Sequence, residues 1–173
     1  MLKVVILTDT DKLVEDDFDS LLPLVACEKQ KRIMRFHFKR DRNNCLLGDI
    51  ITRFELCKAL GLGNEALEFT TNYYEKPLVL RSPNLHFNVS HTGHYVVFAV
   101  DNESVGIDIE LIQPVDLKIA ERFFASDETE CIMEDDQLQR FYEIWTKKES
   151  QIKWEGKGLS KPRVCFKFCA KSK

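Results

Sequence analysis

The chain has 173 residues, of which 44% are hydrophobic and 31% are charged. This length suits one sizeable domain or two small subdomains with a shared core, since domains usually hold about 100–200 residues, and the apolar content excludes wholesale disorder. The 25 Lys and Arg residues stand against 28 Asp and Glu residues, for a formal charge of −3. Because this balance creates no global field that attracts a polyanion, generic nucleic-acid binding is disfavoured.

The N-terminus lacks the features of a targeting segment. Residues 1–8 are apolar, but acidic residues follow them instead of a basic region and a cleavage site, so we expect no signal peptide. No run reaches the roughly 18 apolar residues of a membrane helix. Six cysteines without CxxC pairs favour buried, reduced thiols, and we do not favour zinc at Cys165 and Cys169 because no His lies nearby. We predict a cytoplasmic monomer without nucleic-acid or membrane partners.

In the first half, the sequence predicts strands around two helices. Residues 2–7 are β-rich, and the acidic stretch after them predicts a short helix that ends near Pro23. Residues 27–40 are crowded with Lys and Arg. Apolar residues then recur at three- and four-residue spacing from Leu46 to Leu60, which predicts a helix that Gly61 ends. Short β-type runs follow at about 68–71, 85–89, 94–101 and 104–111.

In the second half, helices replace the sheet after Pro114. They are predicted at about 116–124, at 127–134 behind Ser126 as N-cap, and at about 137–155. Residues 163–170 alternate between polar and apolar side chains and predict a final strand. Because the sequence stops just after it, we expect an open sheet edge unless another segment covers it.

Two carboxylates are the first candidate site. Alternation along the predicted strand 104–111 places Asp108 and Glu110 on one face, side by side. Carboxylates at this separation repel each other unless a proton or a cation lies between them, and their hard oxygens suit Mg²⁺. A solvated acidic strand face accounts for the pattern equally well.

A second candidate lies on the last predicted helix. Trp145, Glu149 and Lys153 are four residues apart and therefore share a stripe, and the aromatic residue indicates that the stripe faces the protein. An ordinary surface Glu–Lys pair, worth a few tenths of a kcal/mol, is the alternative. The need of Asp108 and Glu110 for a cation weakens that alternative.

Residues 87–93, with the sequence FNVSHTG, form the third candidate. They read as a strand that enters a turn and presents Ser90 and His91 at its end. A histidine in such a place commonly only caps a loop. Adjacent Ser and His do not indicate a hydrolase, because a triad is assembled in space and the sequence has no GxSxG elbow.

Taken together and in order, these segments resemble the motifs of the 4′-phosphopantetheinyl transferases of the surfactin-synthetase-activating type. The matching segments are Lys76-Pro77, FNVSH at 87–91, GIDIE at 106–110, FFASDE at 123–128, and WTKKES at 145–150 with Lys153. The resemblance covers most of the chain, from about residue 29 to residue 159. It implies an α+β pseudo-dimer of two similar α/β halves, residues 1–100 and 101–173, with coenzyme A and Mg²⁺ in the cleft between them.

The resemblance also implies an enzyme that transfers phosphopantetheine from coenzyme A to a serine of an acyl or peptidyl carrier protein and releases adenosine 3′,5′-bisphosphate. It implies that Asp108, Glu110 and Glu149 hold Mg²⁺ and that Glu149 also serves as the base. Lys153 would stabilise the leaving phosphate, and Lys148 would lie along the pyrophosphate. The residues implied to contact coenzyme A and its 3′-phosphate are Lys29, Arg32, Lys76, Ser90 and His91.

Some features depart from the family pattern. Glu75 replaces a glycine before Lys76-Pro77, and Asn44 stands where close relatives carry an arginine, for which nearby Arg42 is a possible substitute. Glu128 matches a family acidic position near the metal centre and is equally an acidic first-turn helix residue. Family members continue for several strands beyond 163–170, so we expect a shortened C-terminal half.

A shortened, non-catalytic homologue that binds coenzyme A or a carrier protein is the alternative function, and a metal-dependent nuclease is a weaker one.

Overall fold

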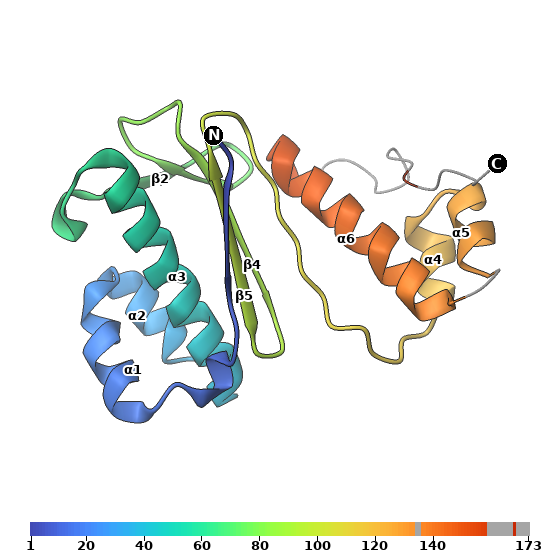
Figure 1. Cartoon of the computed structure of the whole chain (residues 1–173), viewed down its shortest axis with the longest axis horizontal. Coiled ribbons are helices and arrows are strands. Elements are labelled where there is room, and N and C mark those ends of the chain that lie inside the picture. Colours follow the sequence, from blue (N-terminus) through green and yellow to red (C-terminus); the bar gives the residue numbers. More distant parts are fainter. Residues whose placement is uncertain (134–135, 159–167, 169–173) are drawn as a thin grey trace.

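The structure is a computed structural model that describes residues 1–133, 136–158 and 168. It is an α+β fold in which a small sheet lies between two groups of helices (Figure 1). The strands are β1 (Lys3–Leu7), β2 (Phe69–Thr71), β3 (Pro77–Val79), β4 (His86–Thr92) and β5 (Tyr95–Asp101). The α-helices are α1 (Glu15–Leu21), α2 (Cys27–Ile33), α3 (Lys39–Leu60), α4 (Lys118–Phe123), α5 (Ser126–Ile132) and α6 (Gln137–Glu155). Short 3-10 turns cover Thr10–Lys12, Leu22–Leu24 and Asn64–Ala66.

The central sheet is antiparallel, with the strand order β1-β5-β4. β4 and β5 form a hairpin in which Thr92 pairs with Tyr95 across a two-residue turn. Gly93 opens that turn with a φ of 53°, in a region that glycine enters at no steric cost. The predicted strands at 2–7, 68–71, 85–89 and 94–101 are confirmed. The short β3, which pairs with β2, was not predicted because three residues that begin with Pro77 carry no periodic signal.

The helix α3 joins the two cores of the first half. Its Leu56 packs with buried side chains of β4 and β5, and its Leu46 packs with buried side chains of α1 and α2. The helix begins at Lys39, earlier than the sequence predicted. The prediction missed its first turns because they carry polar side chains and therefore lack the apolar periodicity. Asn43 and Asn44 are buried there, and their amides donate to the carbonyls of Thr10 and Gly93. The periodicity of apolar residues does not detect polar side chains that are buried because they form hydrogen bonds.

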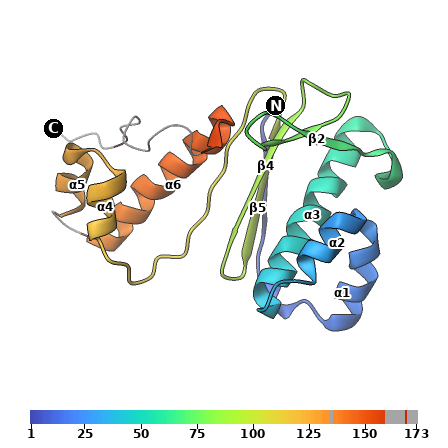
Figure 2. The same cartoon turned by 180° about the vertical axis from the view of Figure 1, so that it is seen from behind.

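In the second half, the described residues form helices from Lys118 onward, after an extended segment. α4, α5 and α6 pack around a cluster that includes Phe124, Ile132 and Phe141, and α6 lies between the other two helices and the sheet (Figure 2). The three predicted helices are confirmed with small shifts at their ends. The predicted strand 163–170 falls outside the described residues except for Phe168. The predicted likeness of the two halves and the shortened C-terminal half therefore stay predictions.

The prediction of a strand at 104–111 is wrong. The segment is extended and runs alongside β4 in space. Among the described residues, however, no backbone ladder joins it to a neighbouring strand. It is held instead by side chains, as where the Ile107 N–H donates to Asn88 Oδ1 at 3.0 Å. Gly106 lets the segment lie directly against α6, since an added Cβ would be 2.0 Å from the Ser150 carbonyl oxygen. Alternation placed the side chains correctly but does not establish a pairing partner.

Two smaller predictions also need correction. Ser126 is the first residue of α5 and not its N-cap, which is Ala125, whose N–H donates to the Glu128 carboxylate. Cys27 is exposed, Cys45 and Cys57 are partly buried free thiols, and Cys131 is disulfide-bonded, so the expectation of buried, reduced thiols throughout is wrong. Across the described part of the chain, none of the helices has the length and apolar character needed to cross a membrane.

Candidate active site

A pocket of about 510 Å³ lies where α2, α3 and β4 meet the C-terminal part of α6. The tertiary structure brings five of the residues implied by the resemblance to its wall. They are Lys29 and Arg32 from α2, Ser90 and His91 from β4, and Lys153 from α6. The first half of the chain and α6 therefore both contribute to one cationic pocket.

Asp49 and Arg53 of α3 also line this pocket, and neither was predicted. The Asp49 carboxylate lies 3.3 Å from Lys29 Nζ and 2.9 Å from Arg53 Nε, so it holds both cations at the wall. Arg53 also donates to Asn64 Oδ1 and lies over the ring of Phe69. Asp49 and Arg53 have the spacing of an ordinary i,i+4 helix pair, so the sequence alone did not indicate that they belong to a site.

Neither Asn44 nor Arg42 supplies a cation to the pocket in place of the arginine of close relatives. Asn44 lines the pocket, but its side chain is engaged by Thr10 and by the Gly93 carbonyl. Arg42 is instead engaged by α1, where it donates to Glu15 at 2.7 Å and covers the ring of Phe18. Arg42 is therefore not a substitute for the arginine of close relatives.

His91 is the histidine among the described residues that line the pocket. Partial desolvation lowers its pKa, and the nearby charges of Lys153 and Lys29 act in the same direction. Asp41 opposes this shift from α3. The imidazole is therefore biased toward its neutral form until an anion binds beside it.

Asp108 does not line the pocket itself but lies behind two residues of its wall, Ser90 and Lys153, and is only 6% exposed. Its Oδ1 accepts hydrogen bonds from Lys153 Nζ at 2.6 Å and from Ser90 Oγ at 2.8 Å. Lys153 also donates to Ser90 Oγ and to the Ile107 carbonyl. The other carboxylate oxygen, Oδ2, is buried without a hydrogen-bond partner. A buried carboxylate oxygen in this state is a candidate cation ligand, because its desolvation is otherwise uncompensated.

Glu110 and Glu149 lie close enough to interact electrostatically. Partial desolvation and the neighbouring charge of Asp108 raise the pKa of Glu110, and the charge of Glu149 adds to the shift. Thr92 Oγ1 donates to Glu110 at 3.2 Å. Within residues 1–133, 136–158 and 168, however, no three His, Cys, Asp or Glu side chains converge as a metal site would require. Asp108 thus has one carboxylate oxygen available to a cation. Glu110 and Glu149 lie near enough to interact by charge but do not complete a set of three converging ligands with it.

The structure places Lys76 outside the pocket. Its Nζ donates to the carbonyls of Val105 and Trp154, and burial lowers its pKa. Lys76 therefore ties its turn to the end of α6, and the prediction of a coenzyme contact has no support in this arrangement. The preceding Glu75 has a φ of 66°, so the glycine of the family pattern corresponds to a real backbone requirement here.

Lys148 is the clearest correction to the predicted site. Its side chain is completely buried, and its Nζ lies 2.7 Å from Glu128 Oε2. It lines none of the walls formed by Lys29, Arg32 and His91. An ammonium group in this position cannot lie along a pyrophosphate in the pocket, because α5 and not the pocket faces it.

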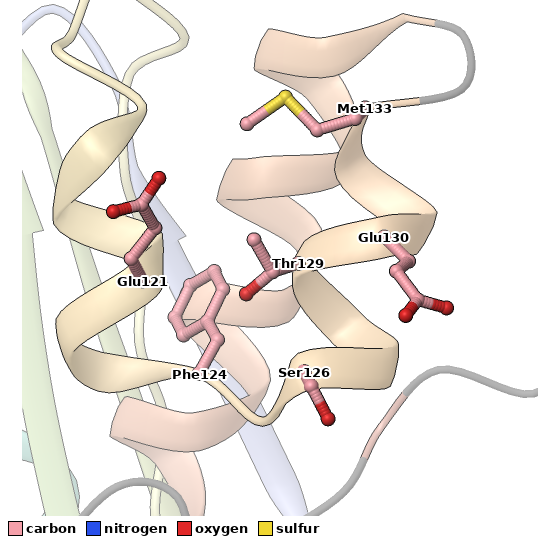
Figure 3. A pocket seen from close by; sticks show the side chains of 6 residues that line it. All are labelled: Glu121, Phe124, Ser126, Thr129, Glu130 and Met133. Atoms are coloured by element: carbon pink, nitrogen blue, oxygen red, sulfur yellow. The ribbon is translucent and has the colours of Figure 1, made fainter.

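A second hollow of about 650 Å³ lies between α4 and α5. Figure 3 shows Phe124 and Thr129 pointing toward each other across it, with Glu130 directed away. Its lining residues are Glu121, Phe124, Ser126, Thr129, Glu130 and Met133. Its described lining residues include no cationic side chain and none of the predicted site residues, so the pocket lined by Lys29 and Lys153 is the candidate site for an anionic ligand.

Known protein families match almost the whole chain. A family described as 4′-phosphopantetheinyl transferase, N-terminal, matches residues 12–103, and the 4′-phosphopantetheinyl transferase superfamily matches residues 104–172. The chain is 40% identical over 157 residues to the 4′-phosphopantetheinyl transferase ffp of Bacillus subtilis, covering 89% of this chain and 70% of that protein. It is 38% identical to the 4′-phosphopantetheinyl transferase Sfp of Bacillus subtilis strain 168 with the same coverage.

Among solved structures, Helicobacter pylori holo-[acyl-carrier-protein] synthase in complex with coenzyme A overlaps 58% of this chain and 97% of that chain. The TM-score is 0.42 and the identity is 14%, which is too low to support a fold assignment. Family membership is instead shown by the sequence, in which two family matches cover adjacent segments and relatives near 40% identity extend over most of the chain. The chain belongs to the 4′-phosphopantetheinyl transferase superfamily.

Proposed function

We propose that this protein transfers the 4′-phosphopantetheine arm of coenzyme A to a serine of an acyl or peptidyl carrier protein in a Mg²⁺-dependent reaction. The serine oxygen attacks the phosphorus next to the pantetheine arm, the bond from that phosphorus to the bridging oxygen breaks, and adenosine 3′,5′-bisphosphate leaves. The observation that carries the proposal is the cationic pocket whose wall residues Ser90 and Lys153 bond to Asp108, a carboxylate with one buried oxygen that has no hydrogen-bond partner.

The pocket supports binding of a polyanionic substrate. Among the described residues, its wall carries four Lys or Arg side chains, Lys29, Arg32, Arg53 and Lys153, against one carboxylate, Asp49. We assign Lys29, Arg32 and His91 to the phosphate groups of coenzyme A. An arriving phosphate would compete with Asp49 for Lys29, so this contact exchanges one anion for another.

The residues around Asp108 fit a magnesium ion. Asp108 Oδ2 would bind it directly, with Glu110 and Glu149 as further oxygen ligands. The bound ion would neutralise charge on the pyrophosphate and its transition state. Ser90 and Lys153 keep Asp108 oriented through Oδ1, so its second oxygen stays directed at the site.

The two functional groups of α6 have different roles in this proposal. Glu149 takes the proton of the attacking serine hydroxyl. Lys153 is 27% exposed and lines the pocket, from which its ammonium group can stabilise the negative charge on the leaving phosphate. We further propose that the halves 1–100 and 101–173 form the cleft as similar units, which agrees with a pocket that both line, and that the protein acts as a cytoplasmic monomer.

A non-catalytic homologue that binds coenzyme A is the second candidate. The observation that favours it is the lack of a converging three-carboxylate group within the described residues. This candidate keeps the phosphate contacts of Lys29 and Arg32 and loses the transfer step. The two functions therefore differ in turnover and not in affinity for coenzyme A.

Intact-mass spectrometry separates the two candidates. An unmodified carrier protein is incubated with this protein, coenzyme A and Mg²⁺, with EDTA and the Asp108→Ala variant as negative controls and Glu103→Gln, an exposed carboxylate outside the pocket, as the matched control. We expect a mass gain of one phosphopantetheine arm that EDTA and Asp108→Ala abolish and Glu103→Gln keeps. No mass gain, with coenzyme A binding intact by calorimetry, would establish the non-catalytic homologue.

A further inference from the structure

The Glu128–Lys148 pair joins three segments of the second half at one buried point. Both side chains are fully buried, and Lys148 Nζ lies 2.7 Å from Glu128 Oε2. The same oxygen accepts the N–H of Ala125 at 2.9 Å, and Oε1 accepts the N–H of Phe168 at 2.8 Å. Lys148 Nζ also lies 5.4 Å from the centre of the Phe124 ring. The pair therefore connects α6, the loop between α4 and α5, and residue 168.

The position of Lys148 on α6 relates this pair to the active site. Successive residues of an α-helix point about 100° apart, so Lys148 and Glu149 leave the helix in different directions, whereas Glu149 and Lys153 share a face. Lys148 is directed at α5. On the other side, Lys153 is bonded to Asp108, Ser90 and the Ile107 carbonyl. Two ion pairs on different sides thus fix both the place and the rotation of α6.

We propose that Glu128 and Lys148 are positioning residues that set the rotation of α6 so that Glu149 and Lys153 face Asp108. This inference rests on the proposed function and replaces the pyrophosphate contact that the family resemblance implied for Lys148. A buried ion pair is costly to desolvate and is destabilising when one partner is lost. Its presence here is explained by the need to hold one specific orientation of the helix that carries the reacting groups.

The test is a double-mutant cycle with Lys148→Met, Glu128→Gln and the double variant, and with the exposed neighbour Lys147→Met as matched control. We expect Lys148→Met to lower kcat at least about tenfold while the KM for coenzyme A stays within about twofold. The double variant removes both charges and should regain most of the lost kcat, because no buried charge is then left unpaired. Lys147→Met should behave as the unaltered protein.

The opposite pattern would overturn the proposal. If Lys148 bound the coenzyme phosphates, Lys148→Met would raise the KM for coenzyme A and the double variant would not recover. Glu128→Gln discriminates even if Lys148→Met fails to fold: positioning predicts a lower kcat at constant KM, whereas a freed phosphate-binding lysine would lower the KM and leave kcat unchanged.

A readout without turnover separates this inference from the proposed function. Mn²⁺ alone, titrated by electron paramagnetic resonance, should bind more weakly to Lys148→Met and recover in the double variant, since Glu149 depends on the rotation of α6. If the unaltered protein transfers nothing but the Mn²⁺ affinities follow this order, the positioning role stands and the proposed function fails. Equal Mn²⁺ affinity in all variants would refute the positioning role.

Discussion

The two sides of α6 carry ion pairs of nearly the same length that do different things. On the pocket side, Lys153 Nζ lies 2.6 Å from Asp108, and on the α5 side, Lys148 Nζ lies 2.7 Å from Glu128. Both oxygens of Glu128 accept hydrogen bonds, whereas Asp108 keeps one buried oxygen without a partner. A structural pair is therefore distinguished from a candidate reactive one by whether both carboxylate oxygens have hydrogen-bond partners, and not by the distance to the lysine.

Asp108→Ala breaks the pocket side and has the largest expected effect. It removes the buried oxygen proposed as a metal ligand, and we expect transfer to fall about 100- to 1000-fold or more, in line with the loss of one strong electrostatic contact to a transition state. The readout is Mg²⁺-dependent transfer by intact mass, with circular dichroism as the check on folding. Activity equal to that of the unaltered protein would rule out Asp108 as a ligand.

Gly106→Ala tests the contact that brings the Asp108 segment against α6. The added Cβ would lie 2.0 Å from the Ser150 carbonyl and 2.4 Å from the Trp154 nitrogen, so backbone must move. We expect the free energy of unfolding to fall by about 3 kcal/mol, at the upper end of typical overpacking. Urea denaturation measures it, and Gly63→Ala is the control, because its Cβ would meet only the flexible Glu65 side chain. Equal stability of the two variants would contradict the close approach.

Lys29→Ala separates substrate binding from the transfer step, because we assign Lys29 to a phosphate remote from the reacting phosphorus. We expect the Kd for coenzyme A to rise about tenfold with kcat little changed, as for a uniform binding contact. Calorimetry with coenzyme A and with its 3′-dephospho form shows whether the lost contact is to the 3′-phosphate. Lys31→Ala, an exposed lysine of the same helix, is the control. A selective loss of kcat at constant Kd would contradict the assignment.

Glu75→Gly probes the turn that Lys76 fastens to the end of α6. Glu75 has a φ of 66°, which costs a non-glycine residue about 1–2 kcal/mol, part of which the greater freedom of glycine in the unfolded chain offsets. We expect the free energy of unfolding to rise by about 1 kcal/mol. Thermal unfolding of Glu75→Gly beside Glu75→Ala measures it, since alanine keeps the strain. A glycine variant no more stable than the alanine variant would show that the turn is unstrained.

His91 is expected to have the smallest effect, and it depends on pH. Its pKa is lowered in the folded protein, mainly by desolvation. Between this lowered pKa and the ordinary value of 6.5, the unfolded chain therefore binds more protons than the folded protein. Stability should therefore decrease as the pH falls from about 6.5 through the folded pKa, and His91→Gln should reduce this slope. Urea denaturation between pH 5 and 7.5 tests it. An identical slope in both proteins would show that His91 does not contribute.

Local patterns predicted most of the elements. Alternation and helical periodicity depend on neighbouring residues, so β4, β5 and α6 were predicted near their observed limits. The segment 104–111 was wrong as a strand because pairing depends on a partner distant in sequence. Yet its alternation correctly placed Asp108 and Glu110 together, since both contact side chains of β4.

The sequence likewise indicated some residues of the candidate site and missed or misplaced others. Order and residue type along the motifs were enough to indicate the family and to select Lys29, Arg32, Ser90, His91 and Lys153, which the fold brings to one pocket. The sequence did not reveal that Lys148 is buried against Glu128, that Lys76 fastens a turn, or that Arg53 lines the pocket, because these contacts arise from long-range packing. The physical reason is that residue type determines which interactions a side chain can make. Burial and the nearest opposite charge, which decide among those interactions, arise only when distant segments pack together.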